Sequence, residues 1–126
     1  MTTIKTISCI ALFSLIIACN SIQNNKKDEV VLEMKIEYSP DSSIRMEYQI
    51  DKATEMKQGF YKEYDEMGLI IKQRTYKDDK IDGIEKNYFS GTKKLDGEFT
   101  YKDGVLNGEF TYYFEENGKI KQKGSY

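Results

Sequence analysis

Few residues in this chain of 126 residues could carry out chemistry. Histidine is absent, which removes the commonest general base and the commonest metal ligand. The glycine of Asp103-Gly104 lies between two expected strands, so it forms no phosphate-binding loop. The acidic residues that recur near expected turns and strand ends are more typical of solvated positions than of catalysis: Glu63, Asp65, Glu66, Asp78, Asp79 and Asp82. We therefore expect a protein that is not an enzyme and that uses no cofactor and no metal.

The balance of acidic and basic residues argues against a nucleic-acid partner. Lysine and arginine number 19, aspartate and glutamate number 21, and the formal net charge is −2. Nucleic-acid-binding domains usually present a basic patch, so we expect no nucleic-acid partner. No motif in the sequence indicates a small-molecule substrate.

Both cysteines, Cys9 and Cys19, lie in the first twenty residues. Residues 7–18 are apolar apart from two serines, which is typical of a secretory signal, and they are too few for a bilayer span of about 20 residues. Residues 16–19, Ile-Ile-Ala-Cys, resemble the lipobox of bacterial lipoprotein signals. The resemblance implies that residues 1–18 are removed as a signal peptide and that Cys19 is diacylated and becomes the new N-terminus.

An uncleaved hydrophobic anchor and an ordinary signal peptide are the alternatives to a lipoprotein signal. Residues 19–29 are mostly polar, so we expect a flexible tether. Two acyl chains would anchor the protein stably in the membrane, because each methylene buried in the bilayer contributes about 0.8 kcal/mol to binding. In enteric bacteria an aspartate directly after the lipobox cysteine resembles an inner-membrane retention signal. Asn20 stands there instead, which favours the outer membrane if the host has one. We expect an exported protein that is lipid-anchored to the bacterial cell membrane or outer membrane.

Residues 59–126 repeat with a period near 25 residues, which indicates a repeated supersecondary unit. The marker positions are Gly59, Gly83 and Gly108, Tyr64, Tyr88 and Tyr113, and Tyr76, Tyr101 and Tyr126. The repeats are 59–82, 83–107 and 108–126, each with two strands joined by a turn. Strand alternation predicts that Ile70, Leu95 and Ile120 share a face with the tyrosines six residues later, Tyr76, Tyr101 and Tyr126. Gly97 and Gly124 on that face would let another group pack closely.

Residues 30–50 predict a diverged first hairpin, so the repeat domain spans 30–126. Residues 30–38 and 44–50 alternate apolar and polar side chains, and the residues between them are typical of a turn. Farther on, Asp103-Gly104 is the signal of a type I′ hairpin turn. Asp79 stands where the preceding repeat should have the matching glycine, so the signal is incomplete there.

The pattern G-x-x-x-x-Y, x-G, Y-K-D-G and N/D-G-E resembles the MORN-type repeat in its bacterial variant form. The stretches that match are residues 83–88, 103–104 and 107–109, and the departures are Asp79 and Gly91. Members of that family stack β-hairpins into an elongated antiparallel sheet, so the resemblance implies an all-β meander. Many bacterial members are labelled antitoxin-like, and eukaryotic relatives serve as interaction modules at membranes.

The aromatic side chains are expected mainly to pack across strands, with a minority exposed to a partner. Our candidates for that minority are Tyr61, Tyr112 and Phe114. Lys119, Lys121 and Lys123 at the last strand either protect a sheet edge or dock on an anionic surface. We expect a non-enzymatic protein-binding or scaffolding module at the cell envelope. The alternatives are an antitoxin or immunity protein for a co-encoded toxin and a lipid-contacting repeat module.

Overall fold

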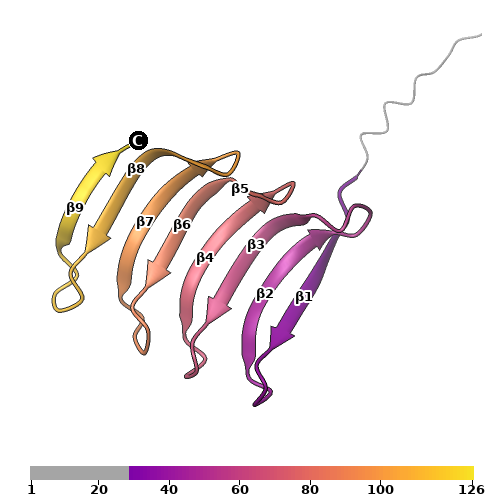
Figure 1. The fold of residues 1–126 in the computed structure, drawn as a ribbon, viewed down its shortest axis with the longest axis horizontal. Helices are drawn as coiled ribbons and strands as arrows, with labels where there is room; N and C mark the ends of the chain where they lie inside the picture. Colours follow the sequence, from indigo (N-terminus) through magenta and orange to yellow (C-terminus); the bar gives the residue numbers. More distant parts are fainter. Residues whose placement is uncertain (1–28) are drawn as a thin grey trace, which may run out of the picture.

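A computed structural model describes residues 29–126 of the chain. The strands form one antiparallel sheet in the order β1-β2-β3-β4-β6-β7-β8-β9, and the short β5 pairs with β4 (Figure 1). No helix occurs among the described residues, which confirms the predicted all-β antiparallel meander. The strands are β1 (Leu32–Tyr38), β2 (Ile44–Asp51), β3 (Lys57–Tyr64), β4 (Ile70–Lys77), β5 (Lys80–Ile81), β6 (Gly83–Tyr88), β7 (Leu95–Lys102), β8 (Val105–Tyr113) and β9 (Ile120–Ser125).

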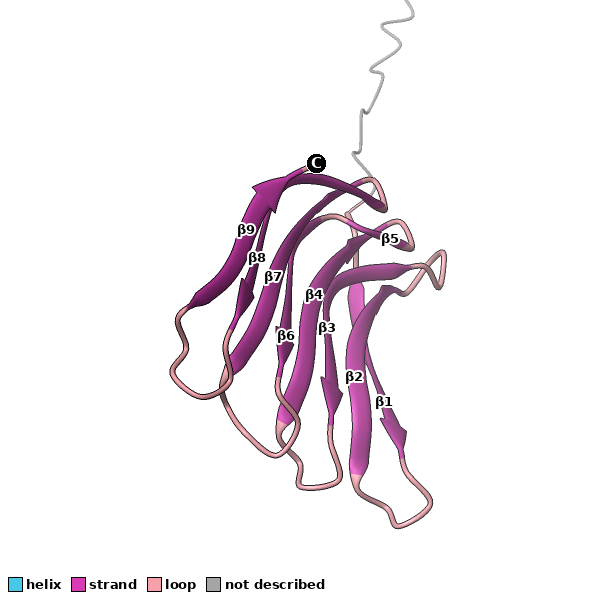
Figure 2. Cartoon of the chain, turned by 60° about the vertical axis from the view of Figure 1, so that its left-hand side comes forward, coloured by secondary structure: helices cyan, strands magenta, loops and turns pink. Residues whose placement is uncertain are grey.

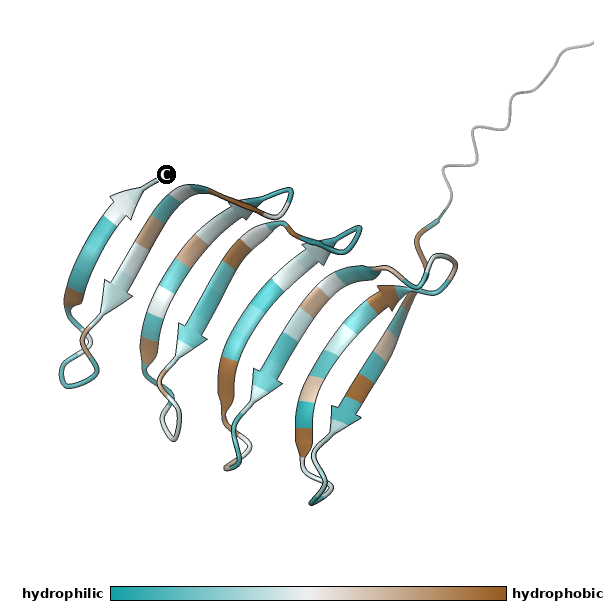
Figure 3. Cartoon of the chain, in the orientation of Figure 1, coloured by the Kyte–Doolittle hydropathy of each residue, from teal (hydrophilic) through white to brown (hydrophobic). Residues whose placement is uncertain are grey.

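The sheet is a single layer whose two faces both meet solvent. Its strands are bowed along their length, and the hairpins lie side by side (Figures 1 and 2). Hydrophobic residues form short separate bands on the strands instead of one continuous layer (Figure 3). Within the described residues only Ile50 and Tyr61 are buried hydrophobic side chains. Stability therefore depends on the strand ladder and on contacts between neighbouring side chains within each face.

The period glycines occupy a backbone conformation that other residues rarely adopt. Gly59, Gly83 and Gly108 have φ of 93°, 116° and 120°. A Cβ added at Gly83 would lie 2.7 Å from the Thr75 hydroxyl oxygen, and one at Gly108 would lie 3.2 Å from the Thr100 Cβ. Glycine recurs here because it tolerates positive φ and leaves room for the side chain of the preceding strand.

The turn with the incomplete signal has the same form as the clear one. Asp78 and Asp79 have φ of 50° and 62°, close to the 51° and 84° of Asp103 and Gly104. Both two-residue turns have positive φ at each central position, as a type I′ turn requires. Aspartate is among the residues that tolerate this region. The hairpin of β4 and β5 therefore forms without the expected glycine.

The two-strand hairpin of each repeat contains one register shift that changes the faces predicted from alternation. The shifts place Ile70, Leu95 and Ile120 opposite Tyr64, Tyr88 and Tyr113. Ile70 also lines a small hollow together with Tyr64 and Tyr88. The prediction that these three aliphatic residues share a face with Tyr76, Tyr101 and Tyr126 is wrong. A β-bulge takes one residue out of the two-residue alternation, so the residues beyond it change face.

Candidate functional site

Cross-strand pairing assigns the side chains to two faces. The face that we call the aromatic face carries a row from β2 to β8: Tyr48, Tyr61, Arg74, Glu85, Phe99 and Phe110. The opposite face, which we call the charged face, carries the adjacent row: Glu47, Lys62, Gln73, Lys86, Glu98, Thr111 and Lys123. Aromatic side chains are common at binding hot spots, so the aromatic face is the first candidate surface.

On β2, β3 and β4 the aromatic face carries a cluster of tyrosines, with the guanidinium of Arg74 over one of the rings. The ring centroids of Tyr48 and Tyr61 are 6.2 Å apart, and those of Tyr61 and Tyr76 are 5.8 Å apart. The Arg74 guanidinium carbon lies 4.5 Å from the centroid of Tyr61, within the range of a cation–π contact. Burial is the main cause that raises the pKa of Tyr61. These contacts bind β2, β3 and β4 into one unit.

An ion pair occupies the centre of the aromatic face. The Arg74 Nη1 atom donates a hydrogen bond of 3.2 Å to the Glu85 carboxylate, which joins β4 to β6. The side chain of Glu85 is 8% exposed and that of Arg74 is 19% exposed, so this pair is the most enclosed of the ion pairs found in residues 29–126. One signal of it is visible in the sequence, since Glu85 takes the position that Phe110 holds in the next repeat.

The second half of the aromatic face packs rings over glycines. The centroid of Phe99 is 5.2 Å from that of Tyr112, and Phe110 is 5.9 Å from Tyr112. The Phe110 ring also lies 5.2 Å from Tyr126. A Cβ added at Gly124 would approach the Phe110 ring to 2.7 Å, and one at Gly97 would approach the Phe99 ring to 3.0 Å. The prediction that these two glycines allow close packing is confirmed.

The three candidate aromatic residues differ in their surroundings. Tyr61 is 5% exposed at the centre of its cluster, so the prediction that it is an exposed contact residue is wrong. Tyr112 is half-buried between Phe99 and Phe110. Phe114 is exposed in the turn after β8, with the Lys121 ammonium 5.9 Å from its ring centroid. Of the three, only Phe114 presents a free ring to a partner.

A hydrogen-bond ladder runs along the charged face. The hydroxyls of Tyr64, Tyr88 and Tyr113 donate to Glu47, Gln73 and Glu98 over 2.7, 2.8 and 2.8 Å. Each bond ties the end of one strand to an earlier strand, which explains the period of these tyrosines. Burial, together with the hydrogen bond to Glu47, raises the pKa of Tyr64 to about 12. Bonds to Lys62 and Tyr64 lower the pKa of Glu47.

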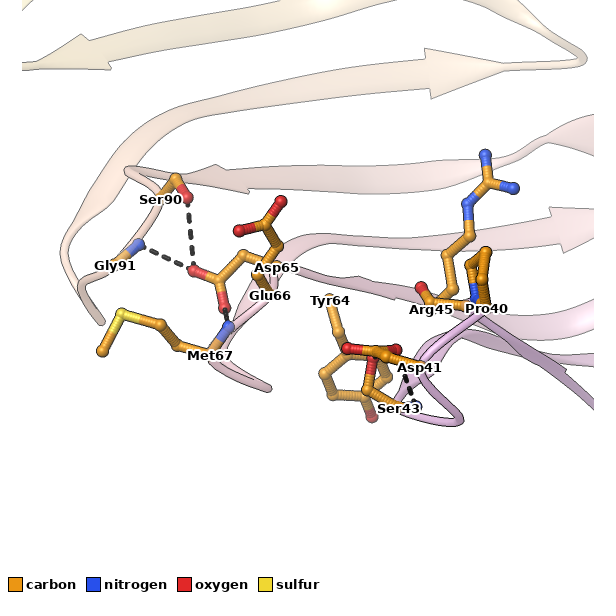
Figure 4. A pocket seen from close by; sticks show the side chains of 11 residues that line it. Pro40, Asp41, Ser43, Arg45, Tyr64, Asp65, Glu66, Met67, Ser90 and Gly91 are labelled. Carbon is orange, nitrogen blue, oxygen red and sulfur yellow. Dashed lines mark hydrogen bonds between the residues drawn. The ribbon is translucent and has the colours of Figure 1, made fainter.

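A groove of about 1060 Å³ lies among the turns at one end of the sheet (Figure 4). Asp65 is the residue that organises it, because its carboxylate accepts hydrogen bonds from the Gly91 amide at 2.7 Å and the Ser90 hydroxyl at 3.3 Å. It also accepts from the amides of Met67 and Leu69. These bonds lower the pKa of Asp65, with the Gly91 amide contributing most. The carboxylate is thus engaged by backbone groups and links two neighbouring hairpins.

Cys19, the expected lipidation site, lies outside the described residues, as do the signal peptide and most of the tether. In the part of the chain that the structure describes, no helix is long and apolar enough to cross a membrane. The described residues also contain no group of three or more potential metal-binding side chains.

No family model, no curated protein and no solved structure matches the chain. The resemblance to the MORN-type repeat therefore stays a prediction.

Proposed function

We propose that the chain is a bacterial lipoprotein, anchored through Cys19, whose sheet is a non-enzymatic binding or scaffolding module at the cell envelope. The anchor is supported by the apolar residues 7–18 followed directly by Ile-Ile-Ala-Cys at the lipobox position. The polar stretch that follows would hold the sheet away from the membrane surface.

The observation that carries the binding role is the single-layer architecture. Soluble proteins usually cover large apolar side chains, yet Phe114, Ile84 and Met34 are all exposed on this sheet. An open sheet offers two broad faces and free edges to a partner, and rigid strands hold these surfaces in place. Both features suit a scaffold that contacts other proteins.

The charged groups favour binding over catalysis. Glu85 is the most enclosed acid among residues 29–126, and its charge is neutralised by Arg74. Asp65 is engaged by backbone amides. Without histidine, no nucleophile has a candidate base. These residues stabilise the sheet instead of leaving a reactive group free.

The anchor is tested by feeding cells a clickable fatty acid and comparing the wild-type chain with Cys19→Ala and Cys9→Ala. We expect label on wild type and on Cys9→Ala, and none on Cys19→Ala. Equal labelling of wild type and Cys19→Ala, or no labelling of either, would show that Cys19 is not the anchor.

The binding role is tested by placing a photoreactive amino acid at Phe114 of the full chain and irradiating intact cells. We expect a crosslinked protein of the envelope, identified by mass spectrometry. Capture of a toxic protein encoded next door would favour the immunity alternative. Binding of the lipid-free chain to anionic vesicles would favour the lipid-contacting alternative. The absence of any crosslink and of vesicle binding would contradict a binding role at this surface.

A further inference from the structure

The two edges of the sheet differ in how they are protected. At the β9 edge, Lys121 and Lys123 stand in the strand and Lys119 in the turn before it, and charged edge strands resist pairing with another chain. The β1 edge instead exposes Leu32, Met34 and Ile36, with 45%, 51% and 41% of their surface accessible. A strand of seven residues with exposed apolar side chains and no proline is a template for strand pairing.

The backbone groups at this edge are ordered for pairing. The Lys52 amide donates a hydrogen bond to the Val31 carbonyl at 2.9 Å. This bond shows which alternate residues of β1 direct their backbone groups toward β2. By the alternation of an antiparallel ladder, Glu33, Lys35 and Glu37 bond to β2. The amide and carbonyl groups of the alternate residues therefore point out of the sheet.

The side chains of β1 separate by face. Leu32, Met34 and Ile36 lie on the charged face, where Ile36 is the cross-strand neighbour of Glu47. Glu33 and Lys35 lie on the aromatic face and contact each other. The strand thus presents an apolar row on one face and alternating charges on the other.

We propose that β1 pairs antiparallel with β1 of a second copy of this chain, continuing the sheet through a two-fold axis at Met34. In this register Leu32 lies opposite Ile36 of the second copy, so the apolar rows meet. Glu33 lies opposite Lys35 of the second copy, which places two pairs of opposite charge across the axis. Such an interface is self-complementary and closes at a dimer.

The charges select the register. A shift of the second copy by two residues places Lys35 opposite Lys35 and Glu33 opposite Glu37, and like charges directly opposite are destabilising. A further shift of two pairs Lys35 with Glu37 but leaves Leu32 beyond the paired segment. The register centred on Met34 is the one that pairs opposite charges and also covers all three apolar side chains. This dimer does not depend on the proposed binding function, because Phe114 and the other edge stay free.

The first test uses the full chain in intact cells, with benzoylphenylalanine replacing Met34 in one sample and Met67 in another. Both methionines are exposed, but Met67 lies in the turn between β3 and β4, far from the proposed axis in the strand order. With two differently tagged copies expressed together, we expect a crosslinked dimer that carries both tags from position 34 alone. Crosslinks from position 34 to a different protein, or no crosslink, would overturn the proposal.

A charge exchange then tests the register with the same crosslink. Glu33→Lys and Lys35→Glu each create two like-charge pairs, so we expect the dimer yield to fall by about tenfold in either variant. The double variant E33K/K35E restores opposite charges and should recover the yield, which also shows that the strand still folds. Glu37→Lys is the control and should leave the yield unchanged. A fall with Glu37→Lys but not with Glu33→Lys would overturn the proposed register.

Discussion

The Arg74 guanidinium donates to the Glu85 carboxylate at 3.2 Å, beside the junction of β4 and β6. This junction has two residue pairs in register, whereas β3 and β4 share six. Among the long strands of the sheet, this is the shortest ladder between neighbours. The ion pair adds a contact between side chains where few backbone pairs join the two strands.

Removing one member of this pair should be strongly destabilising. In Glu85→Leu the enclosed guanidinium loses its counter-charge, and we expect the free energy of unfolding to fall by about 3 kcal/mol. Arg74→Met combined with Glu85→Leu should recover most of this loss, because no charge is left unpaired. Urea denaturation of the wild type, both single variants and the double variant gives the coupling energy. Additive losses in the double variant would show that the pair does not act as a unit.

The period glycines should tolerate substitution by alanine less well than the glycines of open turns. Gly83 and Gly118 both have positive φ, so alanine at either position costs about 1 kcal/mol from backbone strain. At Gly83 the new Cβ also meets the Thr75 hydroxyl, whereas nothing lies within 4 Å at Gly118. We expect Gly83→Ala to destabilise by about 2 kcal/mol or more in thermal or urea unfolding. Equal losses in the two variants would assign the whole effect to φ.

Alkaline pH should weaken the ladder of the charged face. The pKa of Tyr64 rises from 10.0 to about 12 on folding, so its stabilising contribution is complete below pH 10. That contribution is lost as the pH rises from 10 through 12, because the unfolded chain releases the proton first. Tyr64→Phe lacks this group and should lose less stability than the wild type over the same interval. Parallel unfolding curves for the two proteins at each pH would contradict the assignment.

Acidic pH should also weaken the charged face, through protonation of Glu47. The hydrogen bonds from Lys62 and Tyr64 lower its pKa, so the stability that they contribute is present above the unfolded value of 4.5. It is lost as the pH falls below that value and through the folded pKa. We expect Glu47→Gln to be less stable than the wild type at pH 7, with a difference that narrows toward pH 3. The measurement is urea unfolding at a series of pH values.

The hydrogen bond from the Gly91 amide to Asp65 links two neighbouring turns, and hydrogen exchange at that amide reports on it. The Gly91 amide donates to the Asp65 carboxylate, so Asp65→Ala should speed its hydrogen exchange by about tenfold, as expected for losing roughly 1.4 kcal/mol of protection. Glu66→Ala is the neighbouring control and should leave the exchange unchanged. Exchange measured by NMR on the labelled protein reports this amide directly. Similar acceleration in both variants would indicate a general loosening of the turn.

The strands and turns were predictable from the sequence because they depend on local rules. Alternation placed β1 and β2, and the period placed the hairpins that follow. The spacing of the glycines marked Gly83 as a repeat position, and the structure shows that a Cβ there would meet the Thr75 hydroxyl. The turn at Asp78 and Asp79 also follows a local rule, since aspartate can adopt the positive φ that the missing glycine would supply.

The composition of each face was decided by the tertiary structure. The register shifts moved Ile70 opposite Tyr64, and periodicity could not locate them because a bulge is set by the pairing of two strands. Tyr61 is buried because rings from β2 and β4 lie on either side of it, and those neighbours come from other strands of the sheet. The sequence by itself thus determined the repeated hairpin, and it predicts an anchor at Cys19. The sheet decided which side chains meet, because neighbours across strands are fixed by register and not by distance along the chain.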